Sequence, residues 1–187
     1  IRDPEMSRGL GDVYKRQTQK SSDFNGTGTD CTNIDCGVAV TVHTSCNPFI
    51  STTQVVPKCL TLGMGCRKDK DARGIAEAAQ KVLDRSEFHK EAFEQIASID
   101  LKKEEKGILS LSQDWQIPFV TYTEEELKQV PGEFTPSPFV KKITGVDNVC
   151  ERSAVLASGN GRLLQRKTGE NGVTTAVAAR EWRIHFE

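Results

Sequence analysis

Hydrophobic and polar positions follow two different periods along the chain, which predicts strands interleaved with helices. Val38, Val40 and Val42 occupy every second position of one segment, as one face of a strand requires. Ile75 and Ala79 recur at helical spacing instead. On these patterns, strands are expected at 36–43, 54–62, 95–100 and 117–123. Helices are expected at 69–84, 87–93, 104–115 and 148–158.

Local capping and turn signals support these elements and indicate the fold class. Asp69 or Asp71 can cap the first long helix, and Thr123 starts a short helix as a capping box with Glu126. The pair Asn171–Gly172 predicts a tight hairpin near the end of the chain. Strands alternating with helices, followed by a hairpin, predict an α/β fold. The expected form is a three-layer α/β/α sandwich with a mixed, mostly parallel sheet and a C-terminal antiparallel hairpin.

Composition and charge narrow the classes of partner. The 187 residues include 25 basic and 26 acidic ones, so no field of one sign favours nucleic acid or an anionic membrane. No stretch approaches the roughly 20 apolar residues of a membrane helix, and the first residues lack the apolar segment of a secretory signal. Six cysteines do not form a dense, evenly spaced disulfide framework, so a cytoplasmic protein with reduced thiols is expected.

The first 30 residues or so differ from the rest of the chain. They show no helical or strand period and are dominated by Gly, Ser, Thr, Lys and Arg, so they cannot bury enough apolar surface to offset chain entropy. Residues 1–17 also resemble a translated cloning or sequencing-adaptor read. Residues 1–20 are therefore expected to be a non-native or disordered leader, with an ordinary flexible N-terminus as the alternative.

The segment "GMGCRK" at 63–68 leads from an apolar run into the first long helix, as do loops that hold phosphates. It lacks the third glycine of a dinucleotide fingerprint and the pattern of a Walker loop, which disfavours both nucleotide sites. Gly63 and Gly65 would let a ligand approach the backbone, and Arg67 would add charge for an anion. A tight strand-to-helix turn without a ligand explains the pattern equally well.

Cys66 is expected at the start of that helix, where a thiolate would be stabilised. A cysteine nucleophile usually needs a histidine base, and His43, His89 and His185 stand in no recognisable motif. A small residue packed under a turn is therefore the alternative role of Cys66.

Four residues with metal-ligating side chains lie close together in sequence, at Cys31, Cys36, His43 and Cys46. Their spacing fits no common zinc module. Two of them flank a predicted strand, whose side chains alternate between two faces. No metal site is therefore predicted.

Charged residues follow the strand that is expected to end near Asp100. Ligands of open α/β sheets bind beyond the carboxyl ends of the strands. Asp100 or Glu104 could activate water there, and Lys102 could hold a carboxylate. The alternative is a charged, solvated helix N-terminus.

The segment "GVDNVCERSA" at 145–154 is a loop that enters a helix, with Asp147 or Asn148 as its cap. Arg152 and Ser153 are expected on the first turn, where they could donate hydrogen bonds to an anion. Glu151 is either a supporting carboxylate of such a site or a plain exposed residue.

Five segments in order carry a more specific signal: "GMGCRKDK", "IASIDLKKEEKGIL", "IPFVTYTEEEL", "PSPFVKKITGVDNVCERSAVLAS" and "NGVTTAVA". They closely resemble the C-terminal domain of the CbiG family of cobalt-precorrin 5A hydrolases and their shorter CobE relatives. The resemblance covers residues 55–187, and residues 21–54 resemble the family's central linker region. Full-length members also have an N-terminal domain, which is not expected in this chain.

The resemblance implies a role in building the corrin ring of cobalamin. Members of the family open the δ-lactone of cobalt-precorrin 5A with water and release a two-carbon fragment as acetaldehyde. Because this tetrapyrrole substrate carries its own cobalt and many carboxylates, no cofactor or protein metal site is implied. Other enzymes of the pathway or a second copy of this chain are the further partners expected.

On this resemblance, Asp100 or Glu151 is the expected base for the attack of water. Arg67 and Lys102 would hold carboxylate groups or a developing oxyanion. The residues expected to bind the substrate are Gly63, Gly65, Cys66, Arg67, Lys102, Arg152 and Ser153.

Two other functions stay open at this point. The first is a non-catalytic tetrapyrrole-binding module, with the chemistry in the N-terminal domain of full-length members. The second, which has less support, is a nucleotide-binding protein unrelated to corrins.

Overall fold

A computed structural model describes residues 11–13 and 36–181 of the chain. The chain divides into two compact units, Ile1–Pro57 and Lys58–Glu187, which are described separately. The expected leader at 1–20 lies outside the described residues except for 11–13.

The first unit contains a small three-stranded sheet. Its strands are β1 (Gly11–Val13), β2 (Cys36–Thr41) and β3 (Ser51–Val55). Strand β2 lies in the middle, antiparallel to β1 and parallel to β3. The side-chain amide of Gln54 donates to the carbonyl oxygen of Cys46 at 2.9 Å, which holds the connection between β2 and β3. Strand β2 confirms the strand predicted at 36–43, although it ends at Thr41.

The second unit is built on a mixed five-stranded sheet in the order β6-β5-β4-β8-β7. The strands are β4 (Leu60–Cys66), β5 (Phe93–Ile99), β6 (Phe119–Tyr122), β7 (Arg162–Glu170) and β8 (Val173–Ala179). The helices are α1 (Ala72–Ser86), α2 (Lys106–Trp115), α3 (Glu124–Gln129), α4 (Pro138–Thr144) and α5 (Cys150–Ala157). Short 3₁₀ turns cover Lys90–Ala92 and Asp100–Lys102.

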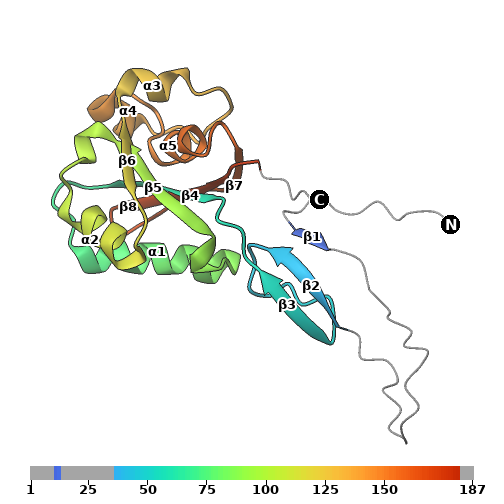
Figure 1. Cartoon of the computed structure of the whole chain (residues 1–187). Helices are drawn as coiled ribbons and strands as arrows, with labels where there is room; N and C mark the ends of the chain where they lie inside the picture. Colours follow the sequence, from blue (N-terminus) through green and yellow to red (C-terminus); the bar gives the residue numbers. More distant parts are fainter. Residues whose placement is uncertain (1–10, 14–35, 182–187) are drawn as a thin grey trace, which may run out of the picture. The chain divides into compact units, whose positions relative to one another are not determined.

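The sheet combines the two kinds of strand pairing that the sequence predicts. Strands β4, β5 and β6 are parallel, whereas β8 runs antiparallel to both β4 and β7. Figure 1 shows α1 and α2 on one face of this sheet and α3, α4 and α5 on the other. The α/β class, the mixed sheet and the C-terminal antiparallel hairpin are therefore confirmed. The expectation that the sheet is mostly parallel is wrong, because two of its four strand pairings are parallel and two are antiparallel.

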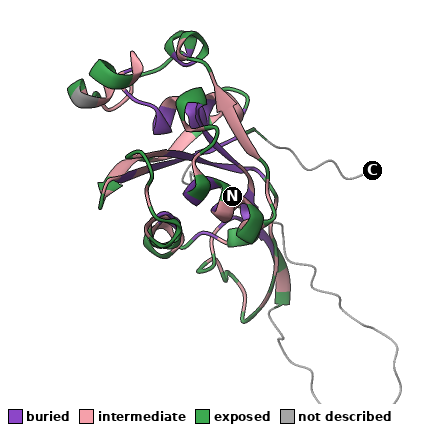
Figure 2. Ribbon diagram, turned by 90° about the vertical axis from the view of Figure 1, so that its left-hand side faces the viewer, coloured by how far each residue is buried: buried purple, intermediate pink, exposed green. Residues whose placement is uncertain are grey.

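The two faces of β4 are packed differently. Leu60, Leu62 and Met64 are fully buried on one face, and Figure 2 shows buried residues gathered where the helices meet the sheet. The opposite face lies beneath α5 and is lined by small residues such as Gly63. A Cβ atom on Gly63 would lie 2.8 Å from the Cβ atom of Ala154 and closer still to a backbone oxygen of α5. Gly63 therefore lets α5 pack directly on the central strand.

The prediction of a strand at 54–62 is wrong in its position. Strand β3 ends at Val55, and β4 begins only at Leu60 and runs to Cys66, so the two glycines lie inside the central strand. Pro57 lies in the break between the two strands, and proline cannot donate to a strand ladder. In sequence, glycine is a turn signal. Here the glycines lie in a strand because α5 packs closely on Gly63 and β8 packs closely on Gly65.

Capping and turn chemistry place the other boundaries well. The Asp71 carboxylate accepts from the backbone N–H of Gly74 at the start of α1. Thr123 forms the predicted capping box at the start of α3. Asn171 and Gly172 have φ angles of 49° and 80°, as the tight turn of a β-hairpin requires. The helix predicted at 87–93 is wrong, because only a 3₁₀ turn precedes β5 there.

Candidate functional site

Three segments meet beyond the carboxyl ends of the parallel strands β4 and β5 in the second unit's sheet. Strands β4 and β5 are parallel, so the loop after Cys66 and the turn that starts at Asp100 lie at the same edge. The β7–β8 turn joins them, because Val173 pairs with Cys66 at the end of β4. This carboxyl edge is where open α/β sheets bind ligands, and we call it the carboxyl-edge site.

The first element of the carboxyl-edge site is an exposed cation held at its base. The backbone N–H of Arg67 donates to the carbonyl oxygen of Gly172 at 2.9 Å, which ties the β4–α1 loop to the hairpin turn. The Arg67 guanidinium group is exposed and makes no ion pair with any of the described residues. It is therefore available for an anion, as predicted for this residue.

The second element is a nearly buried ion pair that joins two loops. The Lys102 ammonium lies 2.9 Å from one carboxylate oxygen of Glu105, and these side chains are only 14% and 7% exposed. The other Glu105 oxygen accepts from the backbone N–H of Lys70 at 3.1 Å. Glu105 therefore links the turn after β5 to the loop after β4, and it restricts Lys102 to one place at the edge.

Cys66 lies beside this pair, but not where the sequence places it. It is the last residue of β4, and α1 begins only at Ala72, so no helix terminus stabilises its thiolate. Burial raises the pKa of the Cys66 thiol above its ordinary value, while the Lys102 ammonium acts in the opposite direction. The expectation of a thiolate stabilised by a helix start is therefore wrong.

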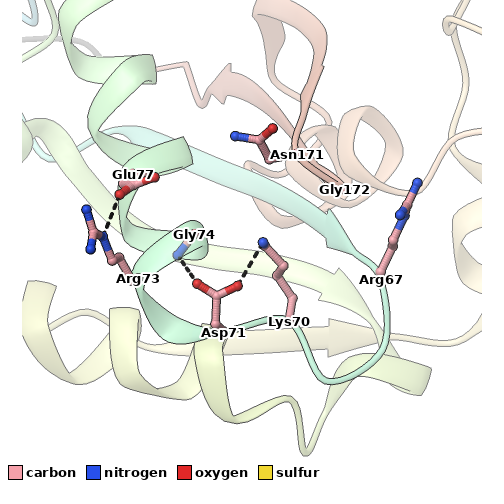
Figure 3. A pocket seen from close by; sticks show the side chains of 8 residues that line it. All are labelled: Arg67, Lys70, Asp71, Arg73, Gly74, Glu77, Asn171 and Gly172. Carbon is pink, nitrogen blue, oxygen red and sulfur yellow. Dashed lines mark hydrogen bonds and ion pairs between the residues drawn. The ribbon is translucent and has the colours of Figure 1, made fainter.

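An open hollow of about 750 Å³ lies between the β4–α1 loop, the first turns of α1 and the hairpin turn (Figure 3). Its lining contains only charged residues, one amide and glycines: Arg67, Lys70, Asp71, Arg73, Gly74, Glu77, Asn171 and Gly172. Two ion pairs lie within it, Lys70–Asp71 and Arg73–Glu77, each at 2.8 Å. Arg67 is the lining cation that remains without a carboxylate among the described residues.

The two glycines predicted to admit a ligand have packing roles instead. Gly63 is buried beneath α5, as described above. A Cβ atom on Gly65 would lie 2.7 Å from the Thr174 hydroxyl oxygen, which donates to the Gly65 carbonyl at 3.2 Å. Both glycines bring neighbouring elements together inside β4, so they form neither the anion-binding loop nor the strand-to-helix turn that the sequence left open.

Glu151 is fully buried and acts as a clamp between segments. Its carboxylate accepts from the backbone N–H and the hydroxyl of Thr135, at 2.8 and 2.9 Å, and from the backbone N–H of Lys167 in β7. These three bonds hold the loop before α4 and the edge strand β7 against α5. The expectation of a plain exposed residue is wrong, and a role of Glu151 as base stays a prediction.

Arg152 and Ser153 also use their polar atoms inside the protein. The Arg152 guanidinium donates to the Asp147 carboxylate at 3.0 Å and to the carbonyl oxygens of Leu127 and Val130 at the end of α3. The buried Ser153 hydroxyl donates to the carbonyl oxygen of Ala97 in β5 at 3.2 Å. The Ser153 hydroxyl therefore has no hydrogen left to donate to a substrate, and Nε and Nη1 of Arg152 are committed to partners within the protein.

The carboxylates of Asp100 and Glu151 do not meet in one site. Asp100 is exposed at the end of β5, whereas Glu151 contacts β7, and strands β4 and β8 lie between them. With neighbouring strands about 4.8 Å apart, the two strands concerned are separated by about 14 Å. The structure brings together Cys66, Arg67, Asp100 and Lys102 at the carboxyl edge, and it leaves Glu151 away from them.

Glu105 and Lys70 were missed by the sequence patterns. Glu105 looked like part of a solvated helix start, and its partner Lys70 lies 35 residues earlier in the chain. No local pattern connects them, because the contact exists only after β4 and β5 pair. Among the described residues, no cluster of three metal-ligating side chains is present, and none of the helices has the length and apolar character needed to span a membrane.

Known proteins support a relationship to cobalamin biosynthesis. The chain is 35% identical to a cobalt-precorrin-5A hydrolase of Salmonella typhimurium over 124 residues, which cover 66% of this chain and 35% of that protein. It is 34% identical to the cobalt-precorrin-5A hydrolase of Priestia megaterium over 122 residues, covering 65% and 32%. The chain thus spans about a third of the length of these relatives.

The fold is similar to that of a smaller protein from the same pathway. The crystal structure of CobE, a protein from the cobalamin (vitamin B12) biosynthetic pathway, superimposes with a TM-score of 0.60 at 28% identity. The match covers 66% of this chain and 92% of that one. The model of the family described as cobalamin synthesis G C-terminus matches residues 60–178, from the start of β4 almost to the end of β8. Because this match takes in well over half of the chain and all five strands of the larger sheet, the chain belongs to the cobalamin synthesis G C-terminus family.

Proposed function

We propose that this chain acts in cobalamin biosynthesis as the C-terminal domain of a cobalt-precorrin-5A hydrolase. The reaction opens the δ-lactone of cobalt-precorrin 5A with water and releases acetaldehyde. The cobalt arrives with the substrate, so the proposal needs no cofactor of the protein. Support comes from the family membership and from the two hydrolases that match at 34–35% identity.

The observation that carries the proposal is the exposed Arg67 at the carboxyl edge of the sheet, which has no ion-pair partner among the described residues and follows Cys66, the neighbour of the Lys102–Glu105 pair. A tetrapyrrole with many carboxylates needs fixed cations for its recognition. Arg67 is fixed at its backbone by Gly172, and Lys102 is fixed by Glu105. The Lys102 ammonium and the backbone of Arg67 are thus held in place before any substrate arrives, which lowers the entropy cost of binding.

Opening a lactone needs a base for the attacking water and donors for the developing oxyanion. Asp100 is the exposed carboxylate at the end of β5, and its predicted role as base is retained in the proposal. Lys102, two residues further on, is the nearest cation along the chain for the oxyanion. We assign Glu151 to the support of the fold, since its oxygens already accept three hydrogen bonds.

One observation favours a second function, in which the domain binds the tetrapyrrole without catalysing the hydrolysis. Of the two predicted bases, Glu151 is committed to internal contacts, and Asp100 has no hydrogen-bonded partner shown among the described residues to orient its carboxylate. An unoriented carboxylate is a weak general base. In this case the rest of a longer hydrolase would supply the chemistry.

Incubating the full chain with cobalt-precorrin 5A separates the two functions. Acetaldehyde is measured by coupling its reduction to NADH oxidation, and binding is measured in parallel from the change in the corrinoid absorption spectrum. Release of acetaldehyde that Asp100→Asn abolishes supports the hydrolase, with Glu91→Gln as a control for an exposed acid at the opposite end of β5. Binding without release supports the second function. If the chain neither binds nor converts the compound, both proposals fail.

A further inference from the structure

Two cations that line the hollow beside α1, Arg67 and Lys70, each have a side chain packed directly against a glycine. A Cβ atom on Gly172 would lie 3.0 Å from Cδ and 3.2 Å from Nε of Arg67, so the Arg67 side chain runs across the hairpin turn. A Cβ atom on Gly74 would lie 2.8 Å from Nζ of Lys70, so the Lys70 side chain lies across the first turn of α1. Figure 3 shows both side chains rising from the same loop toward the level of the hairpin turn.

This packing depends on the backbone conformation at Gly172 and on backbone hydrogen bonds of both cations. Gly172 has a φ of 80° as the second residue of the hairpin turn, a conformation that favours glycine. The backbone of Arg67 bonds to Gly172, and the backbone of Lys70 bonds to Glu105. Each cation is thus held both at its backbone and along its side chain. Such preorganisation is expected of a binding site rather than of solvated surface lysines and arginines.

The charges of the hollow leave capacity for an anion. Asp71 is shared between the Lys70 ammonium and the N–H of Gly74, and Arg67 has no carboxylate partner among the described residues. The lining therefore carries one positive charge in excess, from three cations against two carboxylates. Because Asp71 already caps α1, the excess charge belongs to the side chains and not to the helix end.

The character of the lining restricts what can occupy the hollow. None of its eight lining residues has an apolar side chain. The flat ring of a tetrapyrrole needs apolar or aromatic contacts over its faces, whereas its acetate and propionate arms end in carboxylates. The hollow is therefore suited to the arms and not to the ring.

We propose that this hollow is the subsite in which Arg67 and Lys70 bind carboxylate arms of the tetrapyrrole, while the ring itself stays outside it. This inference rests on the proposed function, since it names where that substrate's carboxylates are held. It adds Lys70 and the turn at Gly172 to the binding residues, and it explains why both cations lie over glycines.

The test uses the full chain and cobalt uroporphyrin III, a stable tetrapyrrole with eight carboxylates, as the probe. Dissociation constants are measured by equilibrium titration for the parent protein, Arg67→Gln, Lys70→Gln and Lys68→Gln. Lys68 is the matched control, because it is an exposed cation in the same loop that does not line the hollow. Thermal unfolding of each variant checks that the fold is retained.

We expect Arg67→Gln and Lys70→Gln each to weaken binding about tenfold or more, the effect of losing one charge-assisted hydrogen bond, and Lys68→Gln to change it less than about twofold. The octaamide of the same porphyrin, which has no carboxylates, should bind the parent and Arg67→Gln equally. Equal effects of all three substitutions, or no effect of Arg67→Gln, would overturn the subsite. In that outcome the proposed function still stands if the parent binds the porphyrin. Failure of the parent to bind either this probe or cobalt-precorrin 5A overturns both.

Discussion

Replacing Glu151 with glutamine should destabilise the domain strongly, although the two side chains have nearly the same shape. The Glu151 carboxylate accepts three hydrogen bonds, from the N–H and hydroxyl of Thr135 and from the N–H of Lys167. A glutamine has one acceptor oxygen, and its NH₂ group would face the N–H of either Thr135 or Lys167. One buried backbone donor would then lose its partner and meet another donor.

The size of the effect follows from these contacts. A hydrogen bond to a charged group contributes about 1.5–3 kcal/mol, and an unsatisfied buried donor costs about 1–3 kcal/mol. Since the glutamine side chain would retain part of the network, we expect the free energy of unfolding to fall by about 2–4 kcal/mol. For a domain of this size, that loss lowers the melting temperature by roughly 10 °C.

Circular dichroism at 222 nm is a suitable measurement, because all helices of the described residues lie in the second unit. Glu104→Gln is the matched control, since Glu104 is an exposed acid for which a surface substitution changes stability by less than about 0.5 kcal/mol. If Glu151→Gln melts within about 2 °C of the parent, the clamp role is refuted, because such a shift corresponds to well under the expected loss. A loss of turnover with an unchanged melt would instead support Glu151 as the base.

Two further predictions concern the central strand. Gly63→Ala should lower the free energy of unfolding by about 2 kcal/mol or more, because its Cβ would overlap α5. Gly169→Ala is the control, since its Cβ would make ordinary contacts and should change this free energy by less than about 0.5 kcal/mol. Equal urea midpoints for the two variants would contradict the packing argument. Lys102→Met should slow alkylation of Cys66 by iodoacetamide at mildly alkaline pH, because removal of the ammonium raises the pKa of the thiol further and reduces its thiolate fraction. Peptide mapping by mass spectrometry gives the rate for this residue, and faster alkylation in the variant would show that Lys102 does not act on the thiol.

Glu105 connects two parts of the carboxyl-edge site. Its carboxylate holds both Lys102 and the backbone of Lys70, so it connects the ion pair at the end of β5 with the hollow beside α1. Lys102 and Lys70 are therefore parts of one connected network, held by a residue that contacts no substrate in the proposal.

Several features of this protein could be predicted from sequence because they depend on neighbours along the chain. The capping box at Thr123, the Asp71 cap and the Asn171–Gly172 turn involve residues no more than three positions apart. The alternation of apolar residues likewise predicted strand β2 and the α/β class. The resemblance of five ordered segments led to the family, which the family match confirms.

Tertiary structure alone decided what the candidate residues contact. Gly63 was assigned to a loop because glycine is a turn signal, yet it lies in a central strand because α5, nearly ninety residues later in the chain, packs on it. The sequence suggested that the polar groups at the start of α5 face a ligand or solvent. In the structure, Glu151, Arg152 and Ser153 form hydrogen bonds with loops and strands that are distant in sequence. Arg67 also precedes a helix, but its guanidinium group has no ion-pair partner among the described residues, because the hairpin binds only its backbone and supports its stem. Local chemistry therefore determined where elements begin and turn, while the pairing of distant segments determined which polar groups are left to bind a ligand.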